Sequence, residues 1–93
     1  MAIKKGYTLG ENDYLNLASI YVKKNDFSHL VTIYESLVKL QPTSAQYMAS
    51  LAVVYAKVGQ IDEAVTVAHR AAQVDPAFEA EAKKFVQSLG RQW

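Results

Sequence analysis

The chain has 93 residues, which is enough for one domain with a modest hydrophobic core. Hydrophobic residues make up 51% of the sequence and the net charge is only +1, so no strong electrostatic attraction to nucleic acid or to an anionic membrane is expected. Cysteine is absent, which excludes disulfides and thiolate metal sites and leaves the compartment undetermined. No apolar run is long enough to cross a membrane and no secretory leader is visible, so we expect a soluble segment without membrane insertion.

The first half of the chain predicts two helices, at about residues 12–24 and 28–40. The first carries an apolar stripe with the i, i+3, i+4, i+7 spacing of one helix face, made by Tyr14, Leu17, Ala18 and Tyr21. The second has its own stripe, made by Leu30, Ile33, Tyr34, Leu37, Val38 and Leu40. Asn25 tolerates the left-handed conformation that often ends a helix, and Asp26 is a good cap for the next one.

The same pattern returns 34 residues later and predicts helices at about residues 45–57 and 61–74. Gly59 takes the place of Asn25, Ser44 is the expected cap, and Pro42 and Pro76 end the helices before them. The two recurring stripes are Met48, Leu51, Ala52 and Tyr55, followed by Ala64, Val67, Ala68, Ala71 and Val74. Because one helix pair cannot bury such stripes alone, the two units are expected to stack on each other.

A fifth helix is predicted at about residues 77–89. One face is apolar and the other is charged, which is typical of the helix that closes a stack; the apolar residues are Phe78, Ala82, Phe85, Val86 and Leu89. Trp93 lies beyond this helix, and we expect it to pack loosely as a frayed end.

These landmarks occupy the slots of a known repeat pattern, W-x2-L-G-x2-Y…A-x3-F…P. From Glu11 to Phe78 the sequence therefore resembles the tetratricopeptide repeat family, with one more helix after it. The resemblance implies an all-α fold, a right-handed superhelix of helix-turn-helix units with five main helices. It implies a first unit at residues 11–44, a second at 45–78, and a capping helix with its tail at 79–93.

Residues 1–10 precede the first full unit and allow two interpretations. Ile3 lies one period before Leu37, so residues 2–5 fit the last turn of a helix from an earlier repeat, ended by Gly6. The chain would then be part of a larger protein. The alternative is a disordered leader that begins with the start methionine.

The sequence gives little support for catalysis. His29 and His69 lie on different helices without metal-ligand spacing, and the four glycines do not form a phosphate-binding loop. Ser28 and His29 are neighbours that face different directions on a helix, so they make no triad. We therefore expect no enzyme activity, no catalytic residues, no cofactor and no metal.

The resemblance implies instead a protein-interaction scaffold, in which the first helix of each unit lines a concave groove that binds a peptide or a partner domain. The groove positions carried over from the family are Asn12, Leu15, Asn16, Ser19, Val22 and Lys23 in the first unit, Gln46, Ala49, Ser50, Val53, Ala56 and Lys57 in the second, and Lys83, Lys84 and Gln87 in the last helix. Alternatively, the apolar members of this set pack against Tyr7 or Leu9, or against another copy.

Two other functions remain open at this stage. One is a self-association element that forms a homodimer through the last helix or through the uncapped first unit, which would leave apolar surface in water. The other is the soluble repeat tail of a bacterial membrane protein, in which comparable repeats occur. No nucleic-acid partner is expected, and the identity of a protein partner cannot be read from the sequence.

Overall fold

The computed structural model describes residues 9–93, and these form five α-helices without strands. The helices are α1 (Glu11–Lys23), α2 (Phe27–Leu40), α3 (Ala45–Lys57), α4 (Ile61–Val74) and α5 (Glu79–Ser88). A short 3-10 helix, η1 (Pro76–Phe78), leads into α5. The five helices match the sequence prediction, whereas the expected helical turn at residues 2–5 lies outside the described residues.

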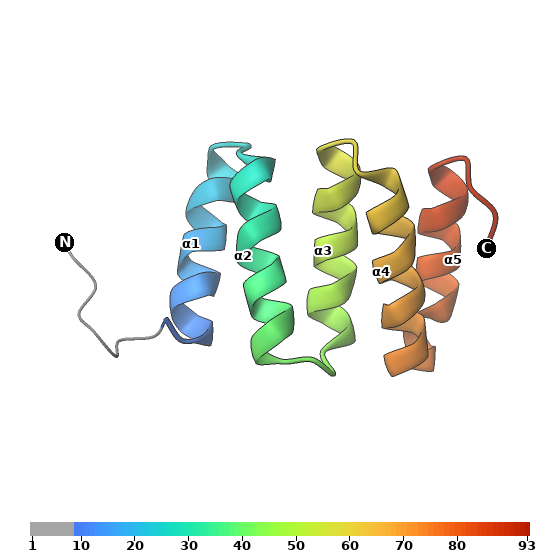
Figure 1. The fold of residues 1–93 in the computed structure, drawn as a ribbon, viewed down its shortest axis with the longest axis horizontal. Helices are drawn as coiled ribbons and strands as arrows, with labels where there is room; N and C mark the ends of the chain where they lie inside the picture. Colours follow the sequence, from blue (N-terminus) through green and yellow to red (C-terminus); the bar gives the residue numbers. More distant parts are fainter. Residues whose placement is uncertain (1–8) are drawn as a thin grey trace.

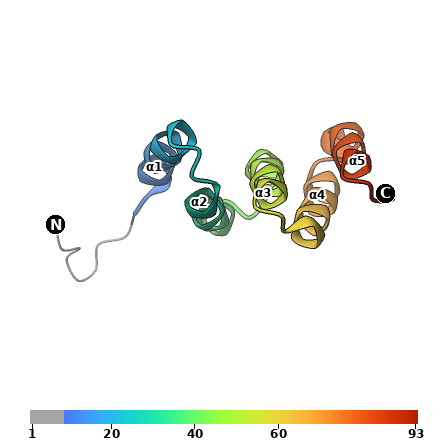
Figure 2. The ribbon, with the colours of Figure 1, turned by 90° about the horizontal axis from the view of Figure 1, so that it is seen from above.

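Successive helices stand side by side in a row (Figure 1). Viewed from above, α1, α3 and α5 lie along one side of the row, and α2 and α4 lie along the other (Figure 2). We call the side formed by α1, α3 and α5 the first-helix face. Each helix packs mainly on the next one in the chain, so the all-helical fold is a solenoid of helix-turn-helix units.

The two turns inside the units share one hydrogen-bond pattern. Asn25 and Gly59 both have positive φ, +54° and +85°, which is the left-handed conformation expected for these residues. The residue after each of them donates its backbone N–H to a tyrosine carbonyl, of Tyr21 and Tyr55, at 2.9 Å in both cases. This hydrogen bond, from the sixth residue of the turn back to the first, satisfies a carbonyl that the helix end would leave unpaired. Local turn chemistry therefore repeats with the sequence period.

Side-chain caps begin the helices α2 and α3. The Asp26 carboxylate accepts the backbone N–H of His29, and the Ser44 hydroxyl accepts that of Tyr47, both at 3.2 Å. Both caps agree with the sequence prediction. Ahead of the last helix, Asp75 accepts the backbone N–H of Ala77 and Pro76 opens η1, so a tight turn precedes α5 and the α-helix itself begins only at Glu79.

The core is not uniform along the row. Between α1, α2 and α3 it is built from large aliphatic residues, among which Leu30 and Leu37 are fully buried. Between α3, α4 and α5 it is built mainly from alanines, closed by the fully buried Val86. Alanines let helices approach closely, but they also fill less volume than leucine or tyrosine.

The C-terminal tail folds back on α4. Trp93 stacks on His69 with ring centroids 4.0 Å apart, and it packs against the alanine cluster between α3, α4 and α5. Arg91 forms an ion pair with Asp62 at 2.7 Å. The sequence reading of Trp93 as a loosely packed end is therefore corrected, because the short tail returns along α4 and places the indole on an aromatic partner.

Candidate functional site

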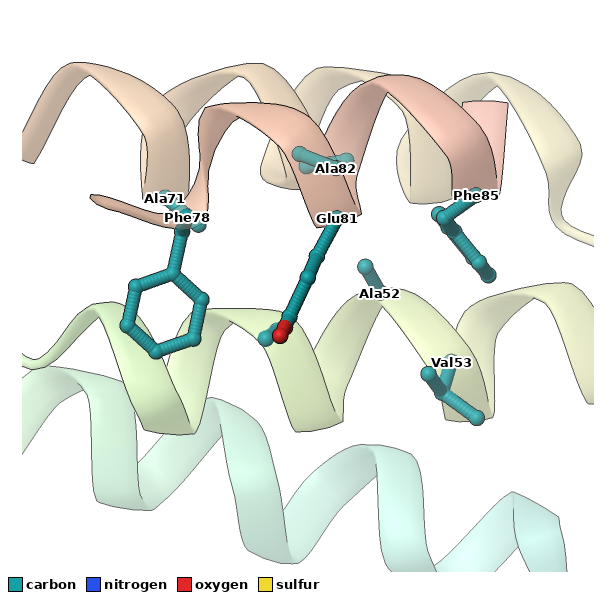
Figure 3. A pocket seen from close by; sticks show the side chains of 9 residues that line it. Ala52, Val53, Ala71, Phe78, Glu81, Ala82 and Phe85 are labelled. Atoms are coloured by element: carbon teal, nitrogen blue, oxygen red, sulfur yellow. The ribbon is translucent and has the colours of Figure 1, made fainter. Parts of the chain in front are cut away.

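A pocket of about 190 Å³ opens between α3 and α5 on the first-helix face. We call it the α3–α5 pocket. Figure 3 shows Phe78, Glu81 and Phe85 reaching from η1 and α5 toward α3, with Glu81 between the two aromatic rings. The lining is apolar except for the Glu81 carboxylate, and it consists of Ala49, Ala52, Val53, Ala68, Ala71, Phe78, Glu81, Ala82 and Phe85.

The lining of the α3–α5 pocket carries small residues where the first unit carries larger ones. Ala68 and Ala71 are buried in its lining. The residues 34 positions earlier are Tyr34 and Leu37, which pack into the core between α1, α2 and α3. The alanines therefore give the α3–α5 pocket an apolar lining of short side chains.

A second pocket, of about 430 Å³ and more open, lies between α1, α3 and the loop before α3. We call it the α1–α3 pocket. Its lining is more polar, with Glu11, Leu15, Gln41, Ser44, Gln46 and Tyr47. Three of these residues lie 34 positions before lining residues of the α3–α5 pocket, as the pairs Leu15 and Ala49, Ser44 and Phe78, and Tyr47 and Glu81. The two pockets therefore occupy the same place in successive units.

Tyr47 has the position in the α1–α3 pocket that Glu81 has in the α3–α5 pocket. Its hydroxyl donates a hydrogen bond to the Glu11 carboxylate. This bond raises the pKa of Tyr47, and burial and the negative charge of Glu11 raise it further. The contact joins α3 to α1 across the first-helix face. The two first helices are thus linked by side chains as well as through α2.

The predicted groove residues divide between these pockets and the open surface. Leu15 and Gln46 line the α1–α3 pocket, and Ala49 and Val53 line the α3–α5 pocket. Ser50 and Ala56 are half-buried on α3, outside both pockets. The remaining predicted residues are exposed and line neither pocket; they are Asn12, Asn16, Ser19, Val22, Lys23, Lys57, Lys83, Lys84 and Gln87.

Three of these exposed residues do not face a pocket as expected: Lys57 on α3, and Lys83 and Gln87 on α5. The Lys57 ammonium lies 5.9 Å from the centroid of the Phe27 ring, so it is turned toward α2. On α5, the pocket is lined by Glu81 and Phe85 in place of Lys83 and Gln87. Residues two positions apart on a helix point about 200° apart, so Lys83 and Gln87 project away from the pocket. The apolar face of α5 both packs on α4 and faces α3.

The described part of the chain offers no cluster for metal chemistry, because no three of its His, Asp and Glu side chains lie together in residues 9–93. The two histidines have aromatic partners, Tyr21 for His29 and Trp93 for His69. His29 also lies 2.6 Å from the Asp26 carboxylate through its Nδ1. In this arrangement both imidazoles hold neighbouring elements together.

Comparison with known families identifies the first of the two units. Residues 14–46 match the sequence model of the tetratricopeptide repeat. The chain contains a tetratricopeptide repeat. The match covers the helices α1 and α2 and enters α3, and the second helix pair repeats its turns and stripes 34 residues later. No curated protein matches the chain.

Tetratricopeptide repeats generally serve as scaffolds for protein–protein interaction and are not catalytic. They typically bind a protein or a peptide. In the described part of this repeat chain, none of the helices has the length and apolar content needed to cross a membrane. The chemistry that the α3–α5 and α1–α3 pockets offer is hydrophobic contact, hydrogen bonding and two carboxylates, those of Glu81 and Glu11.

Proposed function

We propose that the chain is a protein-interaction module that binds a peptide segment of another protein along the first-helix face. The α3–α5 pocket carries this proposal. Ala52 and Ala82, which we call the alanine floor, lie between Phe78 and Phe85 in its lining (Figure 3). Val53, also in the lining, leaves 44% of its surface in water. Apolar surface of this kind gains free energy when a side chain covers it, and the size of the pocket suits one large side chain.

The α1–α3 pocket continues the same surface by one repeat. It offers the Gln41 and Gln46 amides and the Ser44 hydroxyl, which donate to and accept from a peptide backbone without requiring charge. A segment lying across α3 would therefore meet an apolar pocket and a polar one, one unit apart. The proposed site keeps Leu15, Gln46, Ala49 and Val53 from the positions expected by sequence and adds the lining residues from α5.

The test is selection of a random peptide library on the full chain, followed by affinity measurements with variants. Val53→Asp places a charge in the pocket mouth, and Ile20→Asp places the same charge on α1 away from both pockets. Selected peptides should bind the Ile20→Asp variant normally and the Val53→Asp variant at least ~10-fold more weakly, because an unpaired carboxylate would have to be desolvated. Circular dichroism must show that both variants are folded.

Two results would count against a peptide-binding site here. The first is a selection from which no peptide emerges above background. The second is a set of peptides that bind wild-type and Val53→Asp chains equally well, because such peptides would be using another surface.

A second candidate function is self-association through the outer side of α1. Ile20 leaves 48% of its surface exposed, whereas Val54, its equivalent one period later, leaves only 6% because it packs into the cluster between α1, α2 and α3. A helix stacked beside α1 would cover Ile20 in the way that α2 contributes to covering Val54. A second copy of the chain is one source of such a helix.

Light scattering on the eluting protein over a concentration series tests this candidate. A dimer that becomes a monomer in the Ile20→Asp variant would support self-association through α1. A monomer at every concentration would remove this candidate and leave the peptide-binding proposal unaffected.

A further inference from the structure

The α3–α5 pocket combines an apolar lining with a single charged group. Glu81 reaches toward α3 between Phe78 and Phe85 (Figure 3). Among residues 9–93, the ion pairs are those of His29 with Asp26 and of Arg91 with Asp62, so neither involves Glu81. Lys84 lies one turn further along α5, yet it does not line the pocket and forms no ion pair with Glu81 in the described structure. The pocket therefore presents a carboxylate that no described cation neutralises.

We propose that the α3–α5 pocket recognises a basic side chain, preferably arginine, on the peptide segment. This inference rests on the proposed function and names the chemistry of its ligand. The aliphatic stem of an arginine or lysine would lie over the alanine floor, as such stems do on apolar surfaces. Its charged head would reach the Glu81 carboxylate, where a charge-assisted hydrogen bond forms.

The two phenylalanines favour a cation over a neutral apolar side chain. A cation within about 6 Å of a ring face is attracted by the ring quadrupole, and Phe78 and Phe85 lie on either side of Glu81. Arginine suits this arrangement better than lysine, because its planar guanidinium stacks on a ring and pairs with a carboxylate in two places. A purely apolar side chain would instead cover Glu81 and leave its charge poorly solvated.

The preference for a basic side chain is confined to the α3–α5 pocket. In the α1–α3 pocket, Tyr47 stands in the slot of Glu81, and its hydroxyl is already bonded to Glu11. That pocket therefore lacks a free carboxylate at the equivalent place. A bound segment should carry its basic residue where it crosses α3 and α5, and uncharged residues where it approaches α1.

The test is to sequence peptides of about 16 residues, which span ~24 Å if helical, selected from a random phage-displayed library on the full 93-residue chain. Peptides that depend on Val53 should share an arginine or lysine. Changing that residue to glutamine, or changing Glu81→Gln in the protein, should weaken binding ~10-fold or more. Combining both changes should cost little beyond either one, because the two groups act on each other.

Glu79→Gln is the matched control. Glu79 is an exposed carboxylate on the same helix that does not line the pocket, so its loss changes net charge equally and should leave affinity within ~2-fold. If Glu79→Gln weakens binding as much as Glu81→Gln, the effect comes from the net charge of the protein and not from contact with Glu81. The inference is then wrong. A selection on the Glu81→Arg variant should yield peptides without the basic residue.

The possible failures are distinguishable. Val53-dependent peptides that share only apolar residues and tolerate Glu81→Gln would overturn the basic-anchor inference while leaving the peptide-binding proposal intact. Failure to obtain any Val53-dependent peptide would overturn both.

Discussion

Tyr55 on α3 donates its phenolic hydrogen to the Glu35 carboxylate on α2, so the second helix of one unit is tied to the first helix of the next. Burial of Tyr55, its bond to Glu35 and the negative charge of Glu35 together raise its pKa to about 12. Tyr47 makes the corresponding contact to Glu11 on α1. Two tyrosines of α3 thus connect it with both preceding helices.

The raised pKa of Tyr55 predicts a loss of stability in alkaline solution. Its pKa is raised from 10.0 in the unfolded chain to about 12 when folded, so the unfolded chain releases this proton first as the pH rises. The contribution is complete below pH 10 and is lost between pH 10 and pH 12. Urea unfolding across this window should show stability falling less steeply in Tyr55→Phe than in wild type. Equal slopes would contradict the raised pKa of Tyr55 in the folded chain.

The two units should differ in their sensitivity to the same substitution. Leu51 is 4% exposed, so Leu51→Ala should lower the free energy of unfolding by about 2–5 kcal/mol through cavity formation. Leu17, its equivalent one period earlier, is half-buried, so Leu17→Ala should cost less than about 2 kcal/mol. Denaturant unfolding followed by circular dichroism gives both values. A larger loss in Leu17→Ala would mean that α1 is packed more tightly than described.

Filling the α3–α5 pocket from within should separate binding from stability. Ala49 is half-buried in the pocket lining, and the first unit carries Leu15 at this place. Ala49→Leu keeps a strong helix former and occupies the space intended for a ligand, so stability should change by less than about 1 kcal/mol. Peptides selected on the wild-type chain should lose at least ~10-fold in affinity. Unchanged affinity in the folded variant would place the binding surface elsewhere.

The tail contact at Trp93 should contribute measurably to stability. Trp93→Ala removes the stack on His69 and contact with the alanine cluster, which should cost about 1–2 kcal/mol. Arg91→Ala breaks an exposed ion pair in the same tail and should cost less than about 1 kcal/mol. Thermal unfolding of the two variants makes the comparison. If both substitutions leave the stability unchanged, the tail does not pack on α4 as described.

The fold could be predicted because its determinants are local and repeat. The left-handed residues Asn25 and Gly59 end their helices by the same hydrogen bonds, and the Asp26 and Ser44 caps begin the next ones. Helical spacing of apolar residues supplied the rest. Trp93 was misjudged because its contact depends on the path of a three-residue tail, which no periodic pattern encodes.

The candidate site was only half accessible from the sequence. Of the groove positions predicted on α3, Ala49 and Val53 line the α3–α5 pocket, whereas Ser50 and Ala56 lie outside both pockets, and ligand binding by any of them stays a prediction. In η1 and α5, the sequence pattern assigned Phe78 and Phe85 to sealing the stack, and polar residues were expected to face a ligand. In the structure that apolar face also borders the pocket, together with Glu81. The sequence signal for the apolar lining was the change from Tyr34 and Leu37 to Ala68 and Ala71, which appears only when positions 34 residues apart are compared.

The most direct test of peptide binding on the first-helix face is amide chemical-shift mapping by NMR on the isotope-labelled chain. A peptide selected on the wild-type protein would be titrated in, with a scrambled peptide as the control. We predict that the largest shifts cluster on the α3–α5 pocket, at Ala49, Val53, Glu81 and Phe85. Shifts concentrated on α2 and α4, or on the outer side of α1 around Ile20, would contradict the account.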